Sequence, residues 1–92
     1  MKISVIGVGY VGLATAAVLA ELGNDVIAAD IDKKKIDSLN NGIMPIFEPG
    51  LKELVARNIR EKRLRFTHDN KEVIRHGEII FICVGTPPKE NW

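Results

Sequence analysis

The chain has 92 residues and a formal net charge of +1, with 27% charged residues of both signs interspersed along it. This length allows one small domain and is too short for a cofactor domain together with a substrate domain. The weak net charge argues against a nucleic-acid partner, and the single cysteine, Cys83, excludes an internal disulfide and favours a reduced, cytoplasmic protein. No cysteine, histidine or carboxylate cluster indicates a metal site, and His68 and His76 are expected at the surface.

The first predicted elements lie in the uncharged run from residue 3 to residue 20. Ile3, Val5 and Ile6 are β-branched and predict a strand, whereas the Ala- and Leu-rich residues 13–22 predict a buried helix that stops at Gly23. The same run could also be a signal peptide. The glycines in its middle would weaken an inserted helix by about 1 kcal/mol each relative to alanine. We therefore expect a soluble strand–turn–helix and no membrane partner.

The glycines between this strand and helix are spaced as G-x-G-x-x-G, at Gly7, Gly9 and Gly12. Gly7 permits a tight turn, Gly9 lets the backbone approach a pyrophosphate at the start of the helix, and Gly12 allows the helix to pack closely. The spacing predicts a dinucleotide site formed by Gly7, Val8, Gly9, Tyr10, Val11 and Gly12.

A second apolar strand, D-V-I-A-A-D at 25–30, ends in Asp30, 18 positions after Gly12. A carboxylate about 20 residues beyond the glycines is placed to bind the adenine ribose. Because it accepts hydrogen bonds from both ribose hydroxyls and repels a 2′-phosphate, Asp30 favours NAD over NADP.

Asp32 is a good N-cap for the next helix, which carries Ile36 and Leu39. Three lysines follow the cap, at positions 33, 34 and 35, and they oppose the helix dipole. They form either a solvated helix face or a group from which one lysine leans over the adenosine end of the cofactor. The sequence leaves both interpretations open.

The remaining elements continue the alternation of strand and helix. They are a turn-rich segment at 40–50, an amphipathic helix at 51–63, a strand at 64–67, a short helix capped by Asp69 and ending near Gly77, and an apolar strand at 79–84. Alternation predicts an α/β fold: a Rossmann-type parallel sheet with helices on both faces, truncated to about four strands in the order 3-2-1-4. In that order the glycine loop and residues 84–87 face each other across a crevice at the carboxyl ends of the strands.

Three segments together resemble the UDP-glucose/GDP-mannose dehydrogenase family. They are G-V-G-Y-V-G-L at 7–13, F-E-P-G-L at 47–51 and F-I-C-V-G-T-P at 81–87. The glycine triplet is common to many dehydrogenases, including 2-hydroxyacid and hydroxyacyl dehydrogenases, which are not expected to carry the other two segments. The resemblance covers essentially the whole chain.

The resemblance implies an oxidoreductase of polysaccharide biosynthesis that uses NAD. In the family the C6 alcohol of a sugar nucleotide is oxidised to a carboxylate, with two hydrides passed in succession to two NAD molecules. By this implication the glycine loop holds the pyrophosphate, Asp30 binds the adenosine ribose and Lys35 helps at the same end. The implied contacts on the other side of the cofactor are Val84, Gly85 and Thr86.

The resemblance also places the family's catalytic cysteine, lysine, asparagine and aspartate in a later domain, so no catalytic residue is expected in residues 1–92. Cys83, in the last predicted strand, is not that nucleophile. We expect residues 1–92 to be the amino-terminal part of an NAD-binding Rossmann domain, inactive alone, with the substrate and catalytic domains absent. The parent is expected to be a homo-oligomer that meets its nucleotide sugar through those domains. The alternative is a stand-alone, non-catalytic NAD-binding module.

The segment I-M-P-I-F-E-P-G-L at 43–51 has two interpretations. Pro45 and Pro49 restrict the backbone and Glu48 is favourable at a helix start, so the segment could be a rigid entry to the following helix. Alternatively it reaches toward the active-site end of the cleft.

Overall fold

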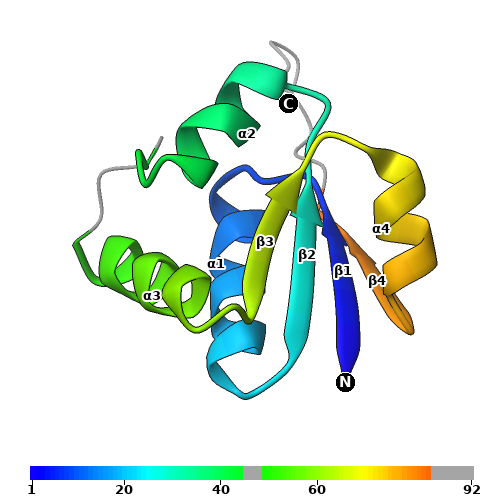
Figure 1. Cartoon of the computed structure of the whole chain (residues 1–92), viewed down its shortest axis with the longest axis horizontal. Helices are drawn as coiled ribbons and strands as arrows, with labels where there is room; N and C mark the ends of the chain where they lie inside the picture. Colours follow the sequence, from blue (N-terminus) through cyan, green and yellow to red (C-terminus); the bar gives the residue numbers. More distant parts are fainter. Residues whose placement is uncertain (45–48, 84–92) are drawn as a thin grey trace, which may run out of the picture.

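The computed structural model describes residues 1–44 and 49–83. Four strands alternate with four helices along these residues (Figure 1). Their bounds are β1 Lys2–Ile6, α1 Tyr10–Glu21, β2 Asp25–Ala29, α2 Lys33–Asn40, α3 Pro49–Arg60, β3 Leu64–Thr67, α4 Asn70–His76 and β4 Ile79–Ile82.

The strands form one parallel sheet in the order β3-β2-β1-β4. The registers pair Ile6 with Ala29 of β2 and with Ile82 of β4, so the carboxyl ends of these three strands lie level with one another. The predicted order 3-2-1-4 is confirmed. It places the topological switch point between β1 and β4, so the loop after β1 begins beside the carboxyl end of β4.

Helices cover both faces of the sheet, as predicted. The larger apolar core joins one face of β1, β2 and β3 to α1, α2 and α3, and the smaller one joins Ile27 and Ala29 to Val73 of α4. Figure 1 shows α4 on the opposite side of the sheet from α1 and α3. Within β1 the side chains alternate: Val5 enters the larger core, and the buried Ser4 donates from Oγ to the Val73 carbonyl at 2.6 Å.

Local sequence explains most helix ends. Asp32 Oδ1 accepts the Lys35 amide at 3.3 Å and Asp69 Oδ1 accepts the Lys71 amide at 2.9 Å, so both predicted caps are confirmed. Two helices begin earlier than the apolar pattern predicts. Helix α1 starts at Tyr10, directly after its N-cap Gly9, and α3 starts at Pro49, a residue favoured in the first turn because its missing N–H would have no partner there.

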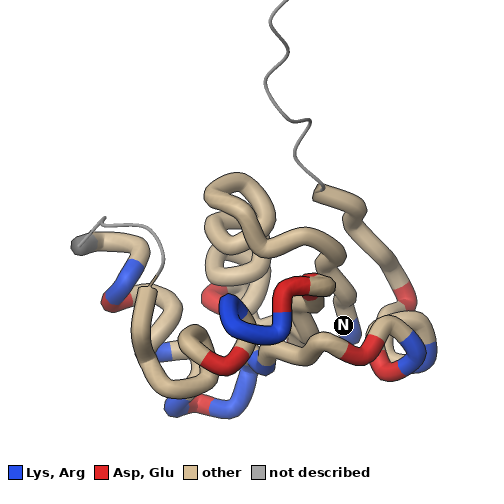
Figure 2. Tube along the Cα trace, turned by 90° about the horizontal axis from the view of Figure 1, so that it is seen from above, with Lys and Arg blue, Asp and Glu red and all other residues tan. Residues whose placement is uncertain are grey.

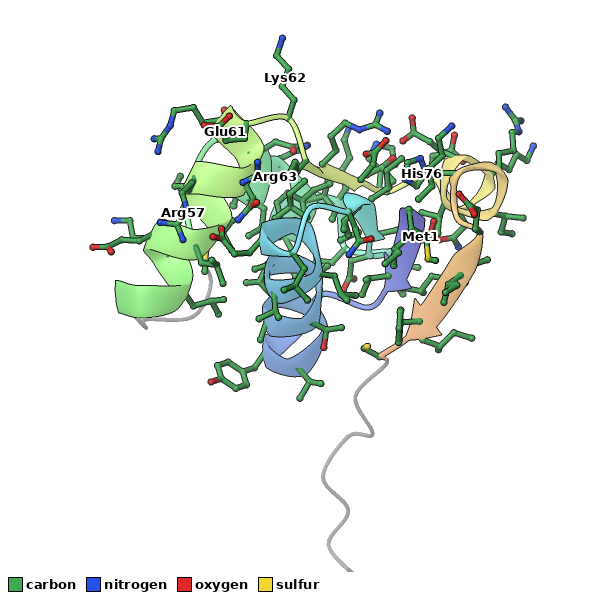
Figure 3. All side chains as sticks on the ribbon, turned by 90° about the horizontal axis from the view of Figure 1, so that it is seen from below. Met1, Arg57, Glu61, Lys62, Arg63 and His76 are labelled. Carbon is green, nitrogen blue, oxygen red and sulfur yellow. The ribbon has the colours of Figure 1, made fainter. Side chains whose placement is uncertain are left out.

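A polar network joins α1 to α3 at the amino-terminal end of the sheet, far from the glycine loop. The fully buried Asn58 donates to Glu21 Oε1 and accepts from Arg63 Nε, and Arg57 donates to the same Glu21 oxygen. Figure 3 shows Arg57 and Arg63 on the side of α3 that faces α1. The side-chain amide of Asn58 has hydrogen-bond partners for both its nitrogen and its oxygen. Asn58 therefore stabilises the α1–α3 contact and leaves no buried polar atom of its side chain unpaired.

His76 does not lie on the surface as predicted. Its side chain is only 8% exposed, and Nε2 lies 2.9 Å from the Asp25 carbonyl oxygen at the start of β2 (Figure 3). The prediction failed because it considered only the end of α4, and the partner comes from a strand 51 residues earlier. His68 is exposed, as expected.

Charged residues of both signs are interspersed along the trace, apart from the uncharged run from residue 3 to residue 20 (Figure 2). Within the described ranges, no helix combines the length and the apolar character needed to cross a membrane.

Strand β4 is apolar but uncovered. Each of its four residues is at least 38% exposed, and Ile82 reaches 70%. In the described part of the chain β4 pairs only with β1, and α4 packs mainly on β1 and β2. Such an edge lacks the lysine, proline or bulge that usually prevents strands of different molecules from pairing.

We expect the 92-residue chain to self-associate through β4 with increasing concentration. Sedimentation velocity should show a rising mean sedimentation coefficient for the wild type, and Ile82→Lys should remain monomeric because a charge on an edge strand opposes pairing. Leu22→Lys is the matched control, since Leu22 is 74% exposed and lies beyond the end of α1. A wild type that stays monomeric at high concentration would contradict the prediction.

Candidate functional site: a glycine loop beside an aspartate

The loop between β1 and α1 turns sharply at Gly7. Its φ angle is +97°, a conformation that residues with a side chain rarely adopt, and its amide donates to the Ala29 carbonyl at 2.7 Å. The turn therefore remains tied to β2 while the chain changes direction toward α1. This agrees with the predicted task of Gly7.

Gly12, in the first turn of α1, is required by close packing. A Cβ at this position would overlap the carbonyl oxygen of Gly7 and lie 3.3 Å from Cβ of Cys83. The close contact is thus with the loop and with the residue after β4, rather than with the sheet as the sequence suggested. Gly9 differs, because a Cβ there would meet no atom of residues 1–44 or 49–83 within 4 Å. Among these residues, the loop backbone at Gly9 accordingly faces open space, which a ligand could occupy.

Asp30 follows β2 and lies against the glycine loop. Its Oδ2 accepts the Val8 amide at 3.0 Å, and its Oδ1 accepts the Asp32 amide at 2.9 Å. The side chain remains 14% exposed. A carboxylate has about four acceptor positions, so two backbone donors leave capacity for further hydroxyl donors.

The charged form of Asp30 is favoured. Burial alone would raise the pKa of this carboxyl, but the amides of Asp32 and Val8, followed by the ammonium of Lys35, outweigh burial and hold the pKa below the ordinary 3.8. Lys35 Nζ lies 3.7 Å from Asp30 Oδ2. At neutral pH the site therefore carries a negative charge beside the loop.

This lowered pKa makes a contribution to stability that depends on pH. Because the folded pKa lies below 3.8, Asp30 stabilises the fold above that pH, and the contribution is lost as the pH falls through the folded pKa. We expect Asp30→Asn to lower the free energy of unfolding by about 1–2 kcal/mol at neutral pH. Urea titrations at a series of pH values should show this difference shrinking on acidification. A difference that is constant down to the acid limit would contradict the prediction.

The structure separates the three lysines. Lys33 and Lys34 are exposed, whereas Lys35 is partly buried and forms the ion pair with Asp30. Lys33 and Lys34 therefore lie on the solvated face of α2, as one of the two interpretations expected. Lys35 lies beside Asp30, and its contact with the adenosine end of the cofactor stays a prediction.

The remaining predicted loop residues have different surroundings. The side chain of Val8 is fully buried in the larger core, so any contact with a cofactor would have to come from its backbone. Tyr10 and Val11, the first residues of α1, are 51% and 65% exposed. Val84, Gly85 and Thr86 lie outside the described residues, as do residues 45–48 of the proline-rich segment.

Cys83 follows β4 rather than lying inside a strand. It is half-buried, and its amide continues the ladder by donating to the Ile6 carbonyl at 2.7 Å. In the part of the chain that the structure describes, no group of three or more His, Cys, Asp or Glu residues could hold a metal ion.

One residue beside the site was missed by the sequence analysis. Ile31 is 88% exposed, and it lies between Asp30 and the cap residue Asp32, whose amide closes a turn onto Asp30. A large apolar side chain is thereby presented to solvent next to the carboxylate. The signal in the sequence was an isolated apolar residue between two aspartates after a strand.

Comparison with known proteins gives this geometry its context. The sequence model of the UDP-glucose/GDP-mannose dehydrogenase family, NAD binding domain, matches residues 1–92. The chain belongs to this family. The matched region is the family's NAD-binding domain, and NAD is its cofactor.

Relatives within the family support the assignment. The chain is 55% identical over 86 residues to UDP-glucose 6-dehydrogenase TuaD of Bacillus subtilis, covering 94% of this chain and 19% of that protein. It is 50% identical to a GDP-mannose 6-dehydrogenase of Pseudomonas savastanoi, covering 99% and 21%. A crystal structure of GDP-mannose dehydrogenase from Pseudomonas aeruginosa, a ternary complex, superposes with a TM-score of 0.91 at 44% identity, covering 99% and 21%. The chain thus spans about a fifth of the length of these family members.

Proposed function

We propose that the chain is the amino-terminal, NAD-binding part of a nucleotide-sugar 6-dehydrogenase. The parent enzyme oxidises the C6 alcohol of a UDP- or GDP-sugar to a carboxylate with two NAD molecules. Residues 1–92 bind the cofactor and do not turn over substrate alone. The names of the relatives, UDP-glucose 6-dehydrogenase and GDP-mannose 6-dehydrogenase, support the reaction class.

The observation that carries the proposal is the contact between Asp30 and the glycine loop. The Asp30 carboxylate accepts the amide of Val8, which stands between Gly7 and Gly9 in the loop. A pyrophosphate bound at the loop therefore places its attached ribose beside Asp30. The ribose hydroxyls then use the acceptor positions that the backbone leaves. The open space at Gly9 and the partial exposure of Asp30 fit a dinucleotide in this orientation.

The other residues of the site have complementary roles. Lys35 balances the charge of Asp30, and the start of α1 favours the anionic pyrophosphate through its dipole. The purine, attached to the same ribose, would pack on the exposed face of Ile31. Val84, Gly85 and Thr86 remain proposed contacts on the opposite side. The bound NAD supplies a hydride acceptor for the sugar carbon.

A chimera tests the proposal directly. Residues 1–92 would replace the matching segment, about a fifth, of Bacillus subtilis UDP-glucose 6-dehydrogenase TuaD, to which the chain is 55% identical over 86 residues. We expect the chimera to form NADH with UDP-glucose, while the isolated 92-residue chain binds NAD in calorimetry and forms no NADH. The same chimera carrying Asp30→Arg is the matched control, and it should lose activity at low NAD concentration.

Two results would contradict the proposal. A chain that binds no NAD would remove the cofactor role. A folded chimera that binds NAD but forms no NADH would favour the alternative of a stand-alone NAD-binding module.

A further inference from the structure

We infer that Asp30 is a positioning residue for the phosphate-binding loop in addition to being the acceptor for the ribose. The Asp30 carboxylate holds the backbone of the loop in the conformation that binds an anionic ligand. Loss of this carboxylate therefore weakens the binding even of ligands that contain no ribose. The inference rests on the proposed function, because the loop is taken as the site of the cofactor's pyrophosphate.

The hydrogen bonds of Asp30 divide between two segments of the chain. Oδ2 accepts the amide of Val8, in the middle of the glycine loop, and Oδ1 accepts the amide of Asp32, just before α2. Asp30 itself is anchored by its own amide, which donates to the Thr67 carbonyl at 3.2 Å. The carboxylate therefore bridges the loop after β1 to the segment after β2.

Val8 depends on this bridge. The residue is fully buried, so its amide has no access to water in the folded chain, and the Asp30 oxygen satisfies it. A buried amide without an acceptor is strongly disfavoured, so removal of the carboxylate should make the loop move or open. Val8 lies between Gly7 and Gly9, and a displacement there alters the amides at the start of α1.

A role of Asp30 through its charge and a role through positioning of the loop predict opposite effects of its replacement on the affinity for a small anion. If Asp30 acted only through its charge near the loop, replacing it with a neutral residue would strengthen the binding of inorganic pyrophosphate. If Asp30 positions the loop, the same replacement weakens it. Inorganic pyrophosphate has no ribose, so loss of the ribose contact cannot produce this weakening.

The experiment compares Asp30→Ala with Asp32→Asn in the 92-residue chain by ¹H–¹⁵N NMR, because an asparagine at position 30 would keep one oxygen able to accept the Val8 amide. Both variants remove one negative charge from the same turn, but Asp32 caps α2 without contacting the loop, and asparagine caps a helix about as well as aspartate. The readouts are the hydrogen-exchange rate of the Val8 amide and the affinity for pyrophosphate, followed by the shifts of the amides at 7–12. Unchanged signals from β3 and α4 establish that each variant is folded.

For Asp30→Ala we expect the Val8 amide to exchange about tenfold faster or more, and pyrophosphate affinity to fall about fivefold or more. Asp32→Asn should leave the exchange rate unchanged and the affinity unchanged or slightly higher. Should Asp30→Ala not fold, Asp30→Glu, which keeps the charge and displaces the carboxylate by one methylene, should show the same two losses.

The outcomes separate the two proposals. A wild type that binds neither NAD nor pyrophosphate overturns the proposed function. A wild type that binds both, with Asp30→Ala equal to Asp32→Asn in exchange rate and affinity, overturns the positioning role alone.

Discussion

Replacing Gly12 with alanine should disrupt the fold and abolish NAD binding together. The new Cβ would overlap the Gly7 carbonyl oxygen and lie 2.9 Å from its carbonyl carbon, and neither backbone atom can move without displacing the turn. Overpacking of this kind costs about 1–3 kcal/mol or more. Each kcal/mol lowers the midpoint of thermal unfolding by about 4–8 °C in a domain of this size. Calorimetric unfolding and NAD titration would measure both effects.

Gly9→Ala is the matched control, because it adds the same methyl group three residues earlier in the chain, at a glycine of the same triplet that lies outside the helix. Space at Gly9 is open and its φ of −70° suits alanine, so the free energy of unfolding should stay within about 1 kcal/mol of the wild type. NAD affinity should nevertheless fall, since the methyl group occupies the place where the pyrophosphate approaches the backbone. A stable, NAD-binding Gly12→Ala variant would contradict the packing argument.

NAD should bind roughly 100-fold more tightly than NADP. Two like charges about 4 Å apart near a protein surface repel by about 4 kcal/mol, and the ammonium of Lys35 offsets part of this. The lowered pKa keeps Asp30 ionised at neutral pH, so the repulsion of a 2′-phosphate is present under ordinary assay conditions. Isothermal titration with the two cofactors measures the ratio. Equal affinities would remove Asp30 from the discrimination.

Asp30→Arg should weaken NAD binding by at least about tenfold and narrow the preference over NADP. The substitution removes the acceptor for the ribose and for the Val8 amide, and it places a second cation beside Lys35. Asp37→Arg makes the same change in net charge at an exposed position of α2 and should leave the affinity for NAD unchanged. If the two variants bind NAD equally, the ribose lies elsewhere.

The features that the sequence predicted well are those decided by neighbours along the chain or by rules of topology. Asp32 and Asp69 cap helices through amides two or three residues away, so their roles could be inferred locally. The strand order followed from the alternation of strands and helices together with the glycine triplet. Asp30 was likewise located by its distance from the triplet along the chain.

The features that the sequence did not predict depend on contacts across the fold. Val8 meets Asp30 because the register of β1 against β2 pairs Ile6 with Ala29. The apolar pattern excludes a slip of one residue but not a slip of two, which keeps the same side chains on each face. His76 Nε2 lies 2.9 Å from the Asp25 carbonyl oxygen, and nothing near His76 in the sequence signals this partner. The separation of Lys35 from Lys33 and Lys34 depends on the orientation of α2 above the sheet, which the three identical residues do not encode.

The shared use of Asp30 by the loop and the expected ribose has a consequence for redesign of coenzyme preference. A serine or arginine at position 30 would admit a phosphorylated ribose, but it would also leave the buried Val8 amide without its acceptor. Retargeting this scaffold to NADP therefore calls for a compensating acceptor for that amide. A milder route would retain Asp30 and strengthen the positive charge around Lys33 and Lys34, where solvent-facing positions tolerate substitution.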